Sequence, residues 1–420
     1  MNTAPKSLRL HIGFFGRTNV GKSSLMNYVV GQDLAITSPI PGTTTDVVEK
    51  SMELWPLGPV VLLDTAGLDD VSELGEARRR RTYAAMQRCD VVVLVCEPGQ
   101  WGPPEEEVLA AARARRVPVV GVVNKSDLGP VPEFQKECLV KSTIGWITAC
   151  AVDAAQREDT ARRFRRLLEQ ALPDAVLAVP PLLGDLLPQG GWLVLIVPID
   201  ISAPRGRLIL PQVQAIRDAL DHDLVVTVVK ESRYAETLAS LPRPPDLVVC
   251  DSQVVDVMVR STPAGIRCTT FSILMARARG DLDELARGAA ALTRLRPQSR
   301  VLIAETCSHH PLEDDIGRVK LPRWLRSMVG ADLHIEHVQG RDYPDDLNGY
   351  DVVIHCGSCM LTRRETLTRI ERAREAGVPI TNYGLAISLA RGVLDRVLKP
   401  FPHAHRAFRA AVDSMVELPL

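Results

Sequence analysis

The sequence has few aromatic residues and no excess of either charge, and these two shortages bear on its partners. Phe, Trp and Tyr make up 4% of the 420 residues, and 50 Lys and Arg residues stand against 51 Asp and Glu residues, for a net charge of -1. Proteins that bind nucleic acid use a basic surface, and many stack bases on aromatic rings. We therefore expect no nucleic-acid partner and no general attraction to an anionic membrane.

Long hydrophobic runs are also missing. The apolar stretches at residues 91–95 and 192–199 have the length of strands and fall short of the roughly 20 residues that a membrane helix needs. No apolar region typical of a secretory signal precedes the first expected strand at residues 8–15. The nine cysteines are odd in number and irregularly spaced, unlike a disulfide framework. These absences predict a cytoplasmic protein with reduced thiols and no membrane partner.

The chain is long, and strand-like segments alternate with helix-like ones. Its 420 residues are too many for a single domain with one hydrophobic core. At about 150 residues per domain, the length predicts about three domains. The alternation is typical of an α/β fold. The expected parts are an α/β domain at residues 1–172, a proline-rich linker at 173–188, a small α/β domain at 189–265 and a third α/β domain at 266–420.

A phosphate-loop motif lies near the amino terminus. Residues 16–23 read GRTNVGKS, which matches the pattern GxxxxGK[ST] between an apolar strand and a helix. Glycines in such a loop allow backbone amides to surround the phosphates. We expect Lys22 to contact the β- and γ-phosphates and the Ser23 hydroxyl to bind Mg²⁺.

Further motifs follow in the order found in GTP-binding proteins. They are PGTTTD at residues 41–46, DTAG at residues 64–67 and NKSD at residues 124–127. We expect Asp64 to hold Mg²⁺ through water, a threonine such as Thr44 to join it, and the Gly67 amide to reach the γ-phosphate. The carboxylate of Asp127 can accept two hydrogen bonds from guanine that adenine does not offer, which predicts specificity for GTP.

These motifs resemble the TrmE and Era group of GTPases over the first expected domain. Leu68 stands where small signalling GTPases carry a glutamine that orients water. In potassium-activated members of the group an asparagine of the phosphate loop binds K⁺, and Asn19 occupies that position, although an ordinary loop role for Asn19 stays open. Residues 148–150 fit the fifth GTPase motif weakly, because Cys150 departs from the usual Ser-Ala-Lys.

The sequence thus predicts a GTPase that hydrolyses GTP to GDP and phosphate with Mg²⁺ and is stimulated by K⁺. The residues expected to act in hydrolysis are Lys22, Ser23, Thr44, Asp64 and Gly67. The residues expected to bind the nucleotide are Gly16, Asn19, Val20, Gly21, Lys22, Ser23, Ser24, Thr43, Thr44, Asp64, Gly67, Asn124, Lys125, Asp127 and Ala149. The expected metal contacts in this domain are Ser23 for Mg²⁺ and Asn19 for K⁺.

A second constellation, of cysteine and histidine, lies in the third expected domain. Cys307 follows the expected strand at residues 301–305, and residues 355–359 read HCGSC after a later one. Because the loops at the carboxyl ends of parallel strands share one edge of a sheet, Cys307, Cys356 and Cys359 can meet there. Three converging thiolates suit an iron-sulfur cluster or zinc. A structural Cys₃His zinc site and a redox pair made by the CxxC motif are the alternatives.

The helix after this motif has a recognisable start. Thr362 and Glu365 match a capping box. The amino end of such a helix, together with Arg363 and Arg364, would bring positive charge toward the thiolates. The six other cysteines lie in or beside apolar runs, so we expect them in the core.

The pattern CxH followed by HCxxC, carried by Cys307, His309, His355, Cys356 and Cys359, resembles the HydF family of [FeFe]-hydrogenase maturation GTPases. Supporting segments are residues 198–214, 269–281, 307–325 and 379–387, so the resemblance covers the whole chain. It implies a [4Fe-4S] cluster on the three cysteines and a homodimer formed through the middle domain. The resemblance also implies that the protein is a scaffold or carrier for a transient diiron subcluster precursor, which is built with the radical-SAM maturases HydE and HydG. The carrier would deliver this diiron subcluster to apo [FeFe]-hydrogenase.

The fourth ligand of the cluster stays open. His309 is the first choice because it lies two residues from Cys307, with His355 and Glu305 as alternatives. An alternative function is a ribosome-assembly or RNA-modification GTPase with a zinc-stabilised carboxyl-terminal domain, which would need a basic RNA-binding face that the third domain does not show. A radical-SAM enzyme would need a compact CxxxCxxC motif, and the chain has none.

Overall fold

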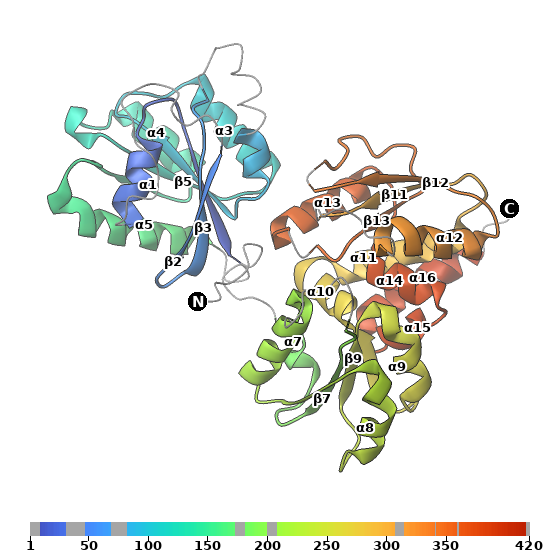
Figure 1. Cartoon of the computed structure of the whole chain (residues 1–420). Helices are drawn as coiled ribbons and strands as arrows, with labels where there is room; N and C mark the ends of the chain where they lie inside the picture. Colours follow the sequence, from blue (N-terminus) through green and yellow to red (C-terminus); the bar gives the residue numbers. More distant parts are fainter. Residues whose placement is uncertain are drawn as a thin grey trace. The chain divides into compact units, whose positions relative to one another are not determined.

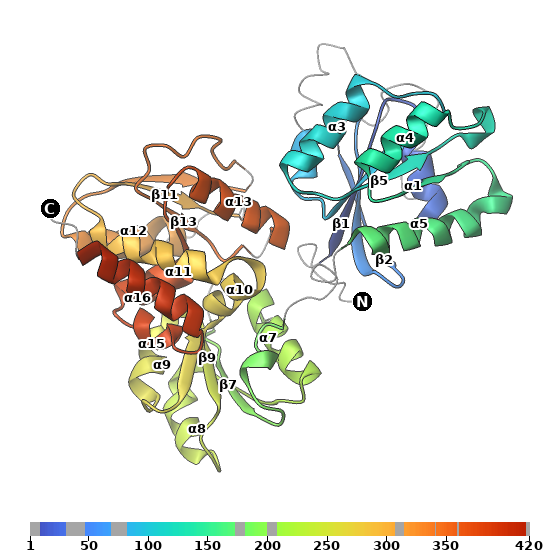
Figure 2. The same ribbon diagram turned by 180° about the vertical axis from the view of Figure 1, so that it is seen from behind.

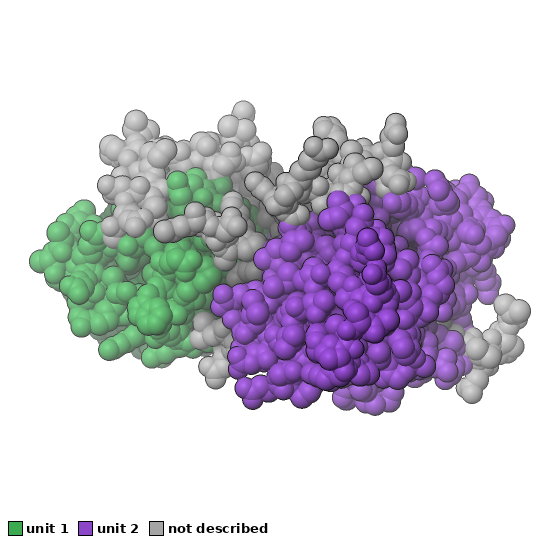
Figure 3. Space-filling view, turned by 60° about the horizontal axis from the view of Figure 1, so that its bottom comes forward, with its two compact units in different colours: residues 1–179 green, residues 180–420 purple. Residues whose placement is uncertain are grey.

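The computed structural model describes residues 9–30, 47–68, 82–172, 181–199, 208–306, 315–340, 342–358 and 361–416. The chain divides into two compact units, residues 1–179 and 180–420, which Figure 3 colours green and purple. Strands and helices alternate in both units, so the predicted α/β fold class is confirmed. In the described part of the chain, no helix is both long enough and apolar enough to cross a membrane.

The first unit is built on a six-stranded sheet with the order β2-β3-β1-β4-β5-β6. Its strands are β1 (Leu10–Phe15), β2 (Val48–Leu54), β3 (Gly58–Asp64), β4 (Val91–Cys96), β5 (Val119–Val123) and β6 (Trp146–Thr148). β2 runs antiparallel to β3, and the other neighbours pair in parallel. Parallel strands of this kind lie between two helical layers, which explains why all six residues of β4 are buried.

Helices cover both faces of this sheet (Figure 1). They are α1 (Lys22–Val30), α3 (Pro103–Ala114), α4 (Glu133–Ser142) and α5 (Arg157–Ala171), with short 3₁₀ turns η2 (Ser126–Leu128) and η3 (Ala154–Gln156). Alternate side chains of β4 enter different cores: Val93 packs with residues of α1 and α5, and Leu94 packs with residues of α3. The ring of Phe14 on β1 stacks on that of Phe164 on α5, with centroids 6.1 Å apart. The loops that follow β1, β3 and β5 therefore share one edge of the sheet.

The second unit contains two parallel four-stranded sheets, with the orders β10-β9-β7-β8 and β12-β11-β13-β14. The first comprises β7 (Trp192–Ile196), β8 (Val225–Val229), β9 (Leu247–Cys250) and β10 (Arg267–Thr270). The second comprises β11 (Arg300–Ala304), β12 (His334–Val338), β13 (Val352–His355) and β14 (Ile380–Asn382). β10 lies just past the boundary expected at residue 265, so the sheet of the middle segment reaches further along the chain.

One continuous hydrophobic core joins the two sheets of the second unit, with members from Leu182 to Ala411. The helices around it are α7 (Leu210–Asp221), α8 (Tyr234–Ser240), α9 (Val255–Ser261), α10 (Phe271–Arg279), α11 (Leu282–Ala291), α12 (Leu321–Val329), α13 (Arg363–Glu375), α14 (Tyr383–Ala390), α15 (Leu394–Leu398) and α16 (Pro402–Val416). Short helical turns also occur: η4 (Gly184–Leu186), η5 (Glu231–Arg233), η6 (Ser252–Val254), η7 (Leu292–Arg294) and η8 (Ile316–Lys320). α11 and α16 lie side by side (Figure 2). The domain boundaries expected within this unit stay a prediction.

Candidate functional site

The phosphate loop connects β1 to α1 in the first unit. Gly21 has a φ of 84° and Asn19 a φ of 63°, both in the left-handed region that glycine and asparagine tolerate best. Gly67 of the DTAG motif lies against the loop, because a Cβ placed on it would meet the Thr18 hydroxyl oxygen at 2.0 Å. Only glycine fits this contact. The structure thus brings the phosphate loop and the DTAG motif together, as the motif order requires.

Lys22 and Ser23 occupy the first turn of α1. The Lys22 ammonium is buried and donates to the carbonyls of Arg17 at 2.7 Å and Gly16 at 3.2 Å. The Ser23 hydroxyl donates to Asp64 Oδ2 at 2.5 Å. A cation and a hydroxyl therefore lie next to the backbone amides that begin the helix, which is the arrangement that binds phosphate and its metal ion.

Asp64 ends β3 and is 1% exposed. Burial raises the pKa of its carboxyl group, and the Ser23 hydrogen bond and the charge of Lys22 counter part of that shift. Among the described residues, Asp64 Oδ1 has no hydrogen-bond partner. A buried carboxylate oxygen beside a serine hydroxyl suits an oxygen-preferring cation such as Mg²⁺, either directly or through a water molecule.

The NKSD motif follows β5 on the same edge. Asn124 Nδ2 donates to the Val20 carbonyl at 2.9 Å and so connects this motif to the phosphate loop. The Lys125 ammonium pairs with Glu97 Oε1 at 2.6 Å. Asp127 lies exposed in η2, where its Oδ1 accepts a hydrogen bond from the Cys150 thiol at 3.2 Å. An exposed carboxylate held by a neighbour is available to read a base.

The remaining predicted nucleotide residues divide between described and undescribed positions. Ala149 is buried, and its carbonyl accepts from the Ser126 amide at 3.1 Å, so the weak fifth motif does adjoin the NKSD motif. Ser24 is a half-buried residue of α1, and Leu68 is buried against the α3 side of the sheet. Thr43 and Thr44 lie outside the described residues, as does the rest of the PGTTTD motif.

Two contacts of this site were not predicted from the sequence. Arg17 of the phosphate loop donates through Nε and Nη2 to the two carboxylate oxygens of Glu105, at 2.8 and 2.7 Å. Glu105 Oε2 also accepts from the Gly102 amide at 2.9 Å, so one carboxylate fixes both the loop and the start of α3. The contact between Cys150 and Asp127 is the other. Arg17, Asp127 and Cys150 lie in motifs, but motif spacing does not specify these side-chain contacts, so the sequence did not predict them.

The cysteine site lies where β11 and β13 end side by side in the second unit. The Cys356 amide donates to the Ala304 carbonyl at 3.0 Å, which continues the pairing of the two strands. Cys356 Sγ lies 3.2 Å from the Thr306 amide, which donates to it, and 3.1 Å from the Thr306 hydroxyl. Thr306 directly precedes Cys307 in the sequence. Cys307, His309 and Cys359 lie outside the described residues.

His355, 3% exposed, has both ring nitrogens engaged. Its Nε2 lies 2.9 Å from Arg369 Nη1, and because a guanidinium only donates, Nε2 must accept. Its Nδ1 then carries the proton, 2.9 Å from the Ser358 hydroxyl and 3.0 Å from the Cys356 carbonyl. Burial, followed by the charge of Arg369, lowers the pKa of His355 to about 3. His355 could bind a metal only by giving up these bonds.

Glu305 is similarly engaged. Its Oε1 accepts from the Tyr383 hydroxyl at 3.1 Å, and its Oε2 accepts from Arg318 Nε at 3.4 Å. Burial raises the pKa of Tyr383 well above its ordinary value, with smaller contributions from Cys356 and Glu305. Two of the three alternatives for the fourth ligand therefore have other partners in the described structure, and the identity of that ligand stays a prediction.

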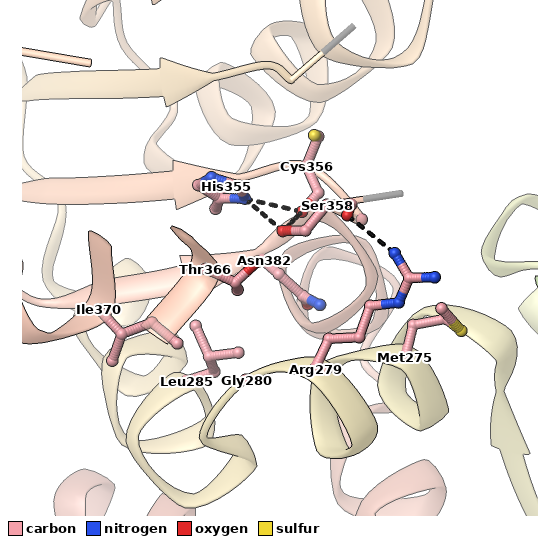
Figure 4. Close-up of a pocket in the computed structure, with 12 residues that line it drawn as sticks. Met275, Arg279, Gly280, Leu285, His355, Cys356, Ser358, Thr366, Ile370 and Asn382 are labelled. Carbon is pink, nitrogen blue, oxygen red and sulfur yellow. Dashed lines mark hydrogen bonds between the residues drawn. The ribbon is translucent and has the colours of Figure 1, made fainter. Parts of the chain in front are cut away.

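The loop at residues 355–358 forms one wall of a small hollow (Figure 4). Its other lining residues come from α10, α11, α13 and β14 and include Met275, Leu285, Ile370 and Asn382. The sulfur of Cys356 points away from Met275 and Leu285 in this view. The side chains of this hollow therefore lie on the side of the loop away from the Cys356 sulfur.

The helix that follows, α13, begins with the predicted capping box. The Thr362 hydroxyl accepts from the Glu365 amide at 3.1 Å, and Glu365 Oε2 accepts from the Thr362 amide at 2.9 Å. This prediction is confirmed. The core placement predicted for the other cysteines is also confirmed for Cys89, Cys96, Cys150, Cys250 and Cys268, which are buried, whereas Cys138 is partly exposed.

The sheet order and the phosphate-loop, DTAG and NKSD motifs on one edge together define a P-loop GTPase. A family model described as a 50S ribosome-binding GTPase matches residues 11–125. The hydrogen maturase F dimerization domain matches residues 182–280, and the hydrogen maturase F tetramerization domain matches residues 283–400. These two matches cover more than half of the chain. The chain therefore belongs to the hydrogen maturase F (HydF) family.

Individual relatives resemble the first unit alone. The tRNA modification GTPase MnmE of Burkholderia orbicola (strain MC0-3) is 41% identical over 127 residues, 29% of this chain and 26% of that protein. MnmE of Synechococcus sp. (strain JA-3-3Ab) is 43% identical over 128 residues, 30% of this chain and 27% of that protein. The chain thus spans about a quarter of the length of these curated relatives. Among solved structures, Aquifex aeolicus Era bound to GDP and aluminium fluoride has 20% identity and a TM-score of 0.34, covering 55% of this chain and 97% of that one.

Proposed function

We propose that the protein binds GTP with Mg²⁺ and hydrolyses it to GDP and phosphate. Lys22 and the amides at the start of α1 would hold the β- and γ-phosphates, while Ser23 and Asp64 would hold Mg²⁺. A bound Mg²⁺ would neutralise charge on the phosphates. The buried Asp64 Oδ1 supports this assignment, because it is an acceptor to which no group in the described structure donates. Thr44 and Gly67 would complete the γ-phosphate contacts, and Thr43, Val20 and Ser24 the surrounding ones.

K⁺ stimulation is part of this proposal. Leu68 is buried among apolar side chains, so it has no polar group with which to orient the attacking water. Asn19 is exposed on the phosphate loop, with its backbone in the left-handed region, and would bind K⁺ near the phosphates. Hydrolysis should then be faster in K⁺ than in Na⁺, and Asn19→Ala should remove the difference. Equal rates of the unsubstituted protein in the two salts would refute the K⁺ site.

We further propose that Cys307, Cys356 and Cys359 hold a [4Fe-4S] cluster. The neighbouring ends of β11 and β13 support this, because Thr306, the residue before Cys307, contacts the Cys356 sulfur through both its amide and its hydroxyl. Hydrogen-bond donors aimed at a sulfur are typical of ligated thiolates. A cluster bound by three cysteines would supply an iron with an exchangeable fourth position, filled by His309, His355, Glu305 or an incoming group.

The family and these two sites support a role in [FeFe]-hydrogenase maturation. We propose a cytoplasmic homodimer that acts as scaffold or carrier for the diiron subcluster of the H-cluster, receives it with HydE and HydG, and delivers it to apo-hydrogenase. The match of residues 182–400 to the two hydrogen maturase F models, in one chain with a GTPase unit, carries this conclusion. An RNA-modification GTPase with a zinc-stabilised tail would account for the first unit only.

A maturation assay tests the proposal. Apo-hydrogenase is mixed with the protein produced alongside HydE and HydG, and hydrogen evolution is measured together with iron and zinc content. We expect activation by the unsubstituted protein and iron in place of zinc. Zinc in stoichiometric amount with no activation would favour the alternative. Lys22→Ala should abolish GTP hydrolysis while leaving the iron content unchanged, which separates failure of the nucleotide site from failure of the cluster site.

A further inference from the structure

The loop that carries Cys356 is held from two sides by buried arginines. From α10, Arg279 Nη1 donates to the Ser358 carbonyl at 3.1 Å, a contact drawn in Figure 4. From α13, Arg369 Nη1 donates to His355 Nε2 at 2.9 Å and Nη2 donates to the Gly340 carbonyl at 2.8 Å. Two guanidinium groups thus contact the residues on either side of Cys356.

The charge of Arg369 is buried without a carboxylate in contact. Arg369 is 7% exposed, and among the described residues it forms no ion pair. The ring of Tyr343 lies 4.8 Å from its guanidinium carbon, which provides a cation–π contact. Glu365, one turn earlier on α13, accepts a hydrogen bond from the Thr362 amide on its Oε2, and its charge acts on Arg369 through space, after Tyr343 and Cys356 in size. Burying a guanidinium that forms no ion pair is costly, and the negative charge of a Cys356 thiolate would stabilise it more than that of Glu365 does.

The neighbouring Arg372 shows the ordinary arrangement. Its guanidinium also lies over the Tyr343 ring, at 5.4 Å, but its Nη2 pairs with Asp345 Oδ1 at 3.0 Å and its side chain is 25% exposed. Arg369 and Arg372 therefore share a helix and an aromatic partner, and differ in burial and in forming an ion pair within the described structure.

The contacts of Arg369 lead to Cys356. Arg369 fixes the ring of His355, and the protonated Nδ1 of that ring faces the Cys356 carbonyl and the Ser358 hydroxyl. The negative charge expected at this place is that of the thiolates and the group they bind. One-electron reduction of such a group adds a further negative charge, which a buried cation stabilises.

We propose that Arg369 is a positioning residue of the cluster site, which orients the Cys356 loop through His355 and, by its positive charge, raises the reduction potential of the cluster. This inference rests on the proposed function, because it takes Cys356 as a cluster ligand. It assigns to α13 a role in setting the electron affinity of the site.

The test compares three variants of the full chain after anaerobic reconstitution with iron and sulfide. Arg369→Gln removes the charge, Arg369→Lys keeps it and loses the guanidinium fork, and Arg372→Gln removes the paired and partly exposed charge on the same helix. Iron and sulfide content is measured first, and the midpoint potential is then measured by dithionite titration followed by electron paramagnetic resonance. Circular dichroism reports whether each variant folds.

We expect a more negative midpoint potential in Arg369→Gln, with Arg369→Lys and Arg372→Gln close to the unsubstituted protein. An unchanged midpoint in folded Arg369→Gln would overturn the proposal. If that variant fails to fold, Arg369→Lys decides: an unshifted midpoint supports the role of charge, and a shift to more negative potential contradicts it. Absence of iron and sulfide from the unsubstituted protein would refute the cluster assignment itself, which is a distinct outcome.

Discussion

At the scale of single residues, the nucleotide motifs are held together by contacts that cross the first unit. The Asn124 side chain reaches the Val20 carbonyl, Lys125 pairs with Glu97, and the Cys150 thiol donates to Asp127. These contacts fix the direction of each motif relative to the phosphate loop. The NKSD motif is therefore joined both to the phosphate loop and to the segment at Cys150.

Asp127→Asn tests the choice of base. The substitution replaces a charged acceptor with an amide that offers one acceptor oxygen, and hydrogen bonds to charged groups contribute about 1.5–3 kcal/mol each. We expect GTP binding to weaken by about 10- to 100-fold, measured by competition between GTP and ATP. Asp159→Asn, an exposed carboxylate on α5 that pairs with Arg162, is the matched control and should change nothing. Unaltered discrimination in Asp127→Asn would remove this residue from the base pocket.

Some side-chain roles could be predicted from the sequence and others could not. Lys22, Asp64 and Asn124 belong to motifs whose spacing is restricted by phosphate and base chemistry, and the structure brings them to one edge. The engagement of His355 depends on Arg369, which lies on the next helix, and on the register of β13 with β11. No local pattern carries that information, so the sequence left His355 open as an alternative to His309, the first choice.

At the scale of elements, the start of α13 depends on a capping box next to the cysteine site. Thr362→Ala removes the acceptor of the Glu365 amide hydrogen bond, and loss of a threonine cap costs about 1 kcal/mol. We expect the free energy of unfolding of the second unit to fall by that amount in urea titrations. Thr368→Ala, in the interior of the same helix, should be neutral or slightly stabilising, because alanine is the better helix former. Equal effects of the two substitutions would contradict the capping role.

β8 is the element most suited to a homodimer contact. It forms one edge of its sheet, and Val225 and Val228 are 47% and 45% exposed. Val213 and Leu220 on α7, a helix that packs beside β8, are also exposed. The opposite edge strand, β10, is covered, because α15 packs against it. An uncovered edge strand of β-branched residues is a template for pairing with a second chain.

Val228→Lys should therefore weaken the dimer. A charge on an apolar edge strand opposes edge-to-edge pairing, so we expect the fraction of monomer to rise in size-exclusion chromatography with light scattering. Val152→Lys is the control, since Val152 is exposed on a loop of the first unit and should leave the mass unchanged. A Val228→Lys protein with the original mass at low concentration would place the contact elsewhere.

The strands of the second unit were predictable to within a residue or two where they are apolar runs, as in β11 and β13, whereas β7 begins at Trp192 as expected but ends at Ile196, before the end of its apolar run at residue 199. β10 was not, because its sequence RCTT is short and contains no hydrophobic run, and its three buried residues are small. Its place in the sheet follows from pairing with β9, which is a long-range contact. The small α/β domain was expected to end at residue 265 because no pattern in the sequence indicated β10, which follows that residue.

At the scale of the whole molecule, the two sites belong to separate compact units. The phosphate loop, DTAG and NKSD motifs lie in residues 1–179, and Cys356 with its hydrogen-bonded neighbours lies in residues 180–420. Each unit has its own hydrophobic core. A substitution that removes a cluster ligand should therefore leave the nucleotide site folded and active.

The separation of the nucleotide site from the cysteine site is tested most directly by measuring iron content, sulfide content and the rate of GTP hydrolysis on the same anaerobically purified protein. Cys356→Ser exchanges a soft thiolate for a hard, poorly ionised hydroxyl, and Cys138→Ser, at a partly exposed cysteine of α4, is the control. We expect Cys356→Ser to lose most of its iron and sulfide while hydrolysing GTP at the unsubstituted rate, and Cys138→Ser to keep both. A Cys356→Ser protein with its full iron content, or an unsubstituted protein without iron, would contradict a GTPase that carries an iron-sulfur cluster.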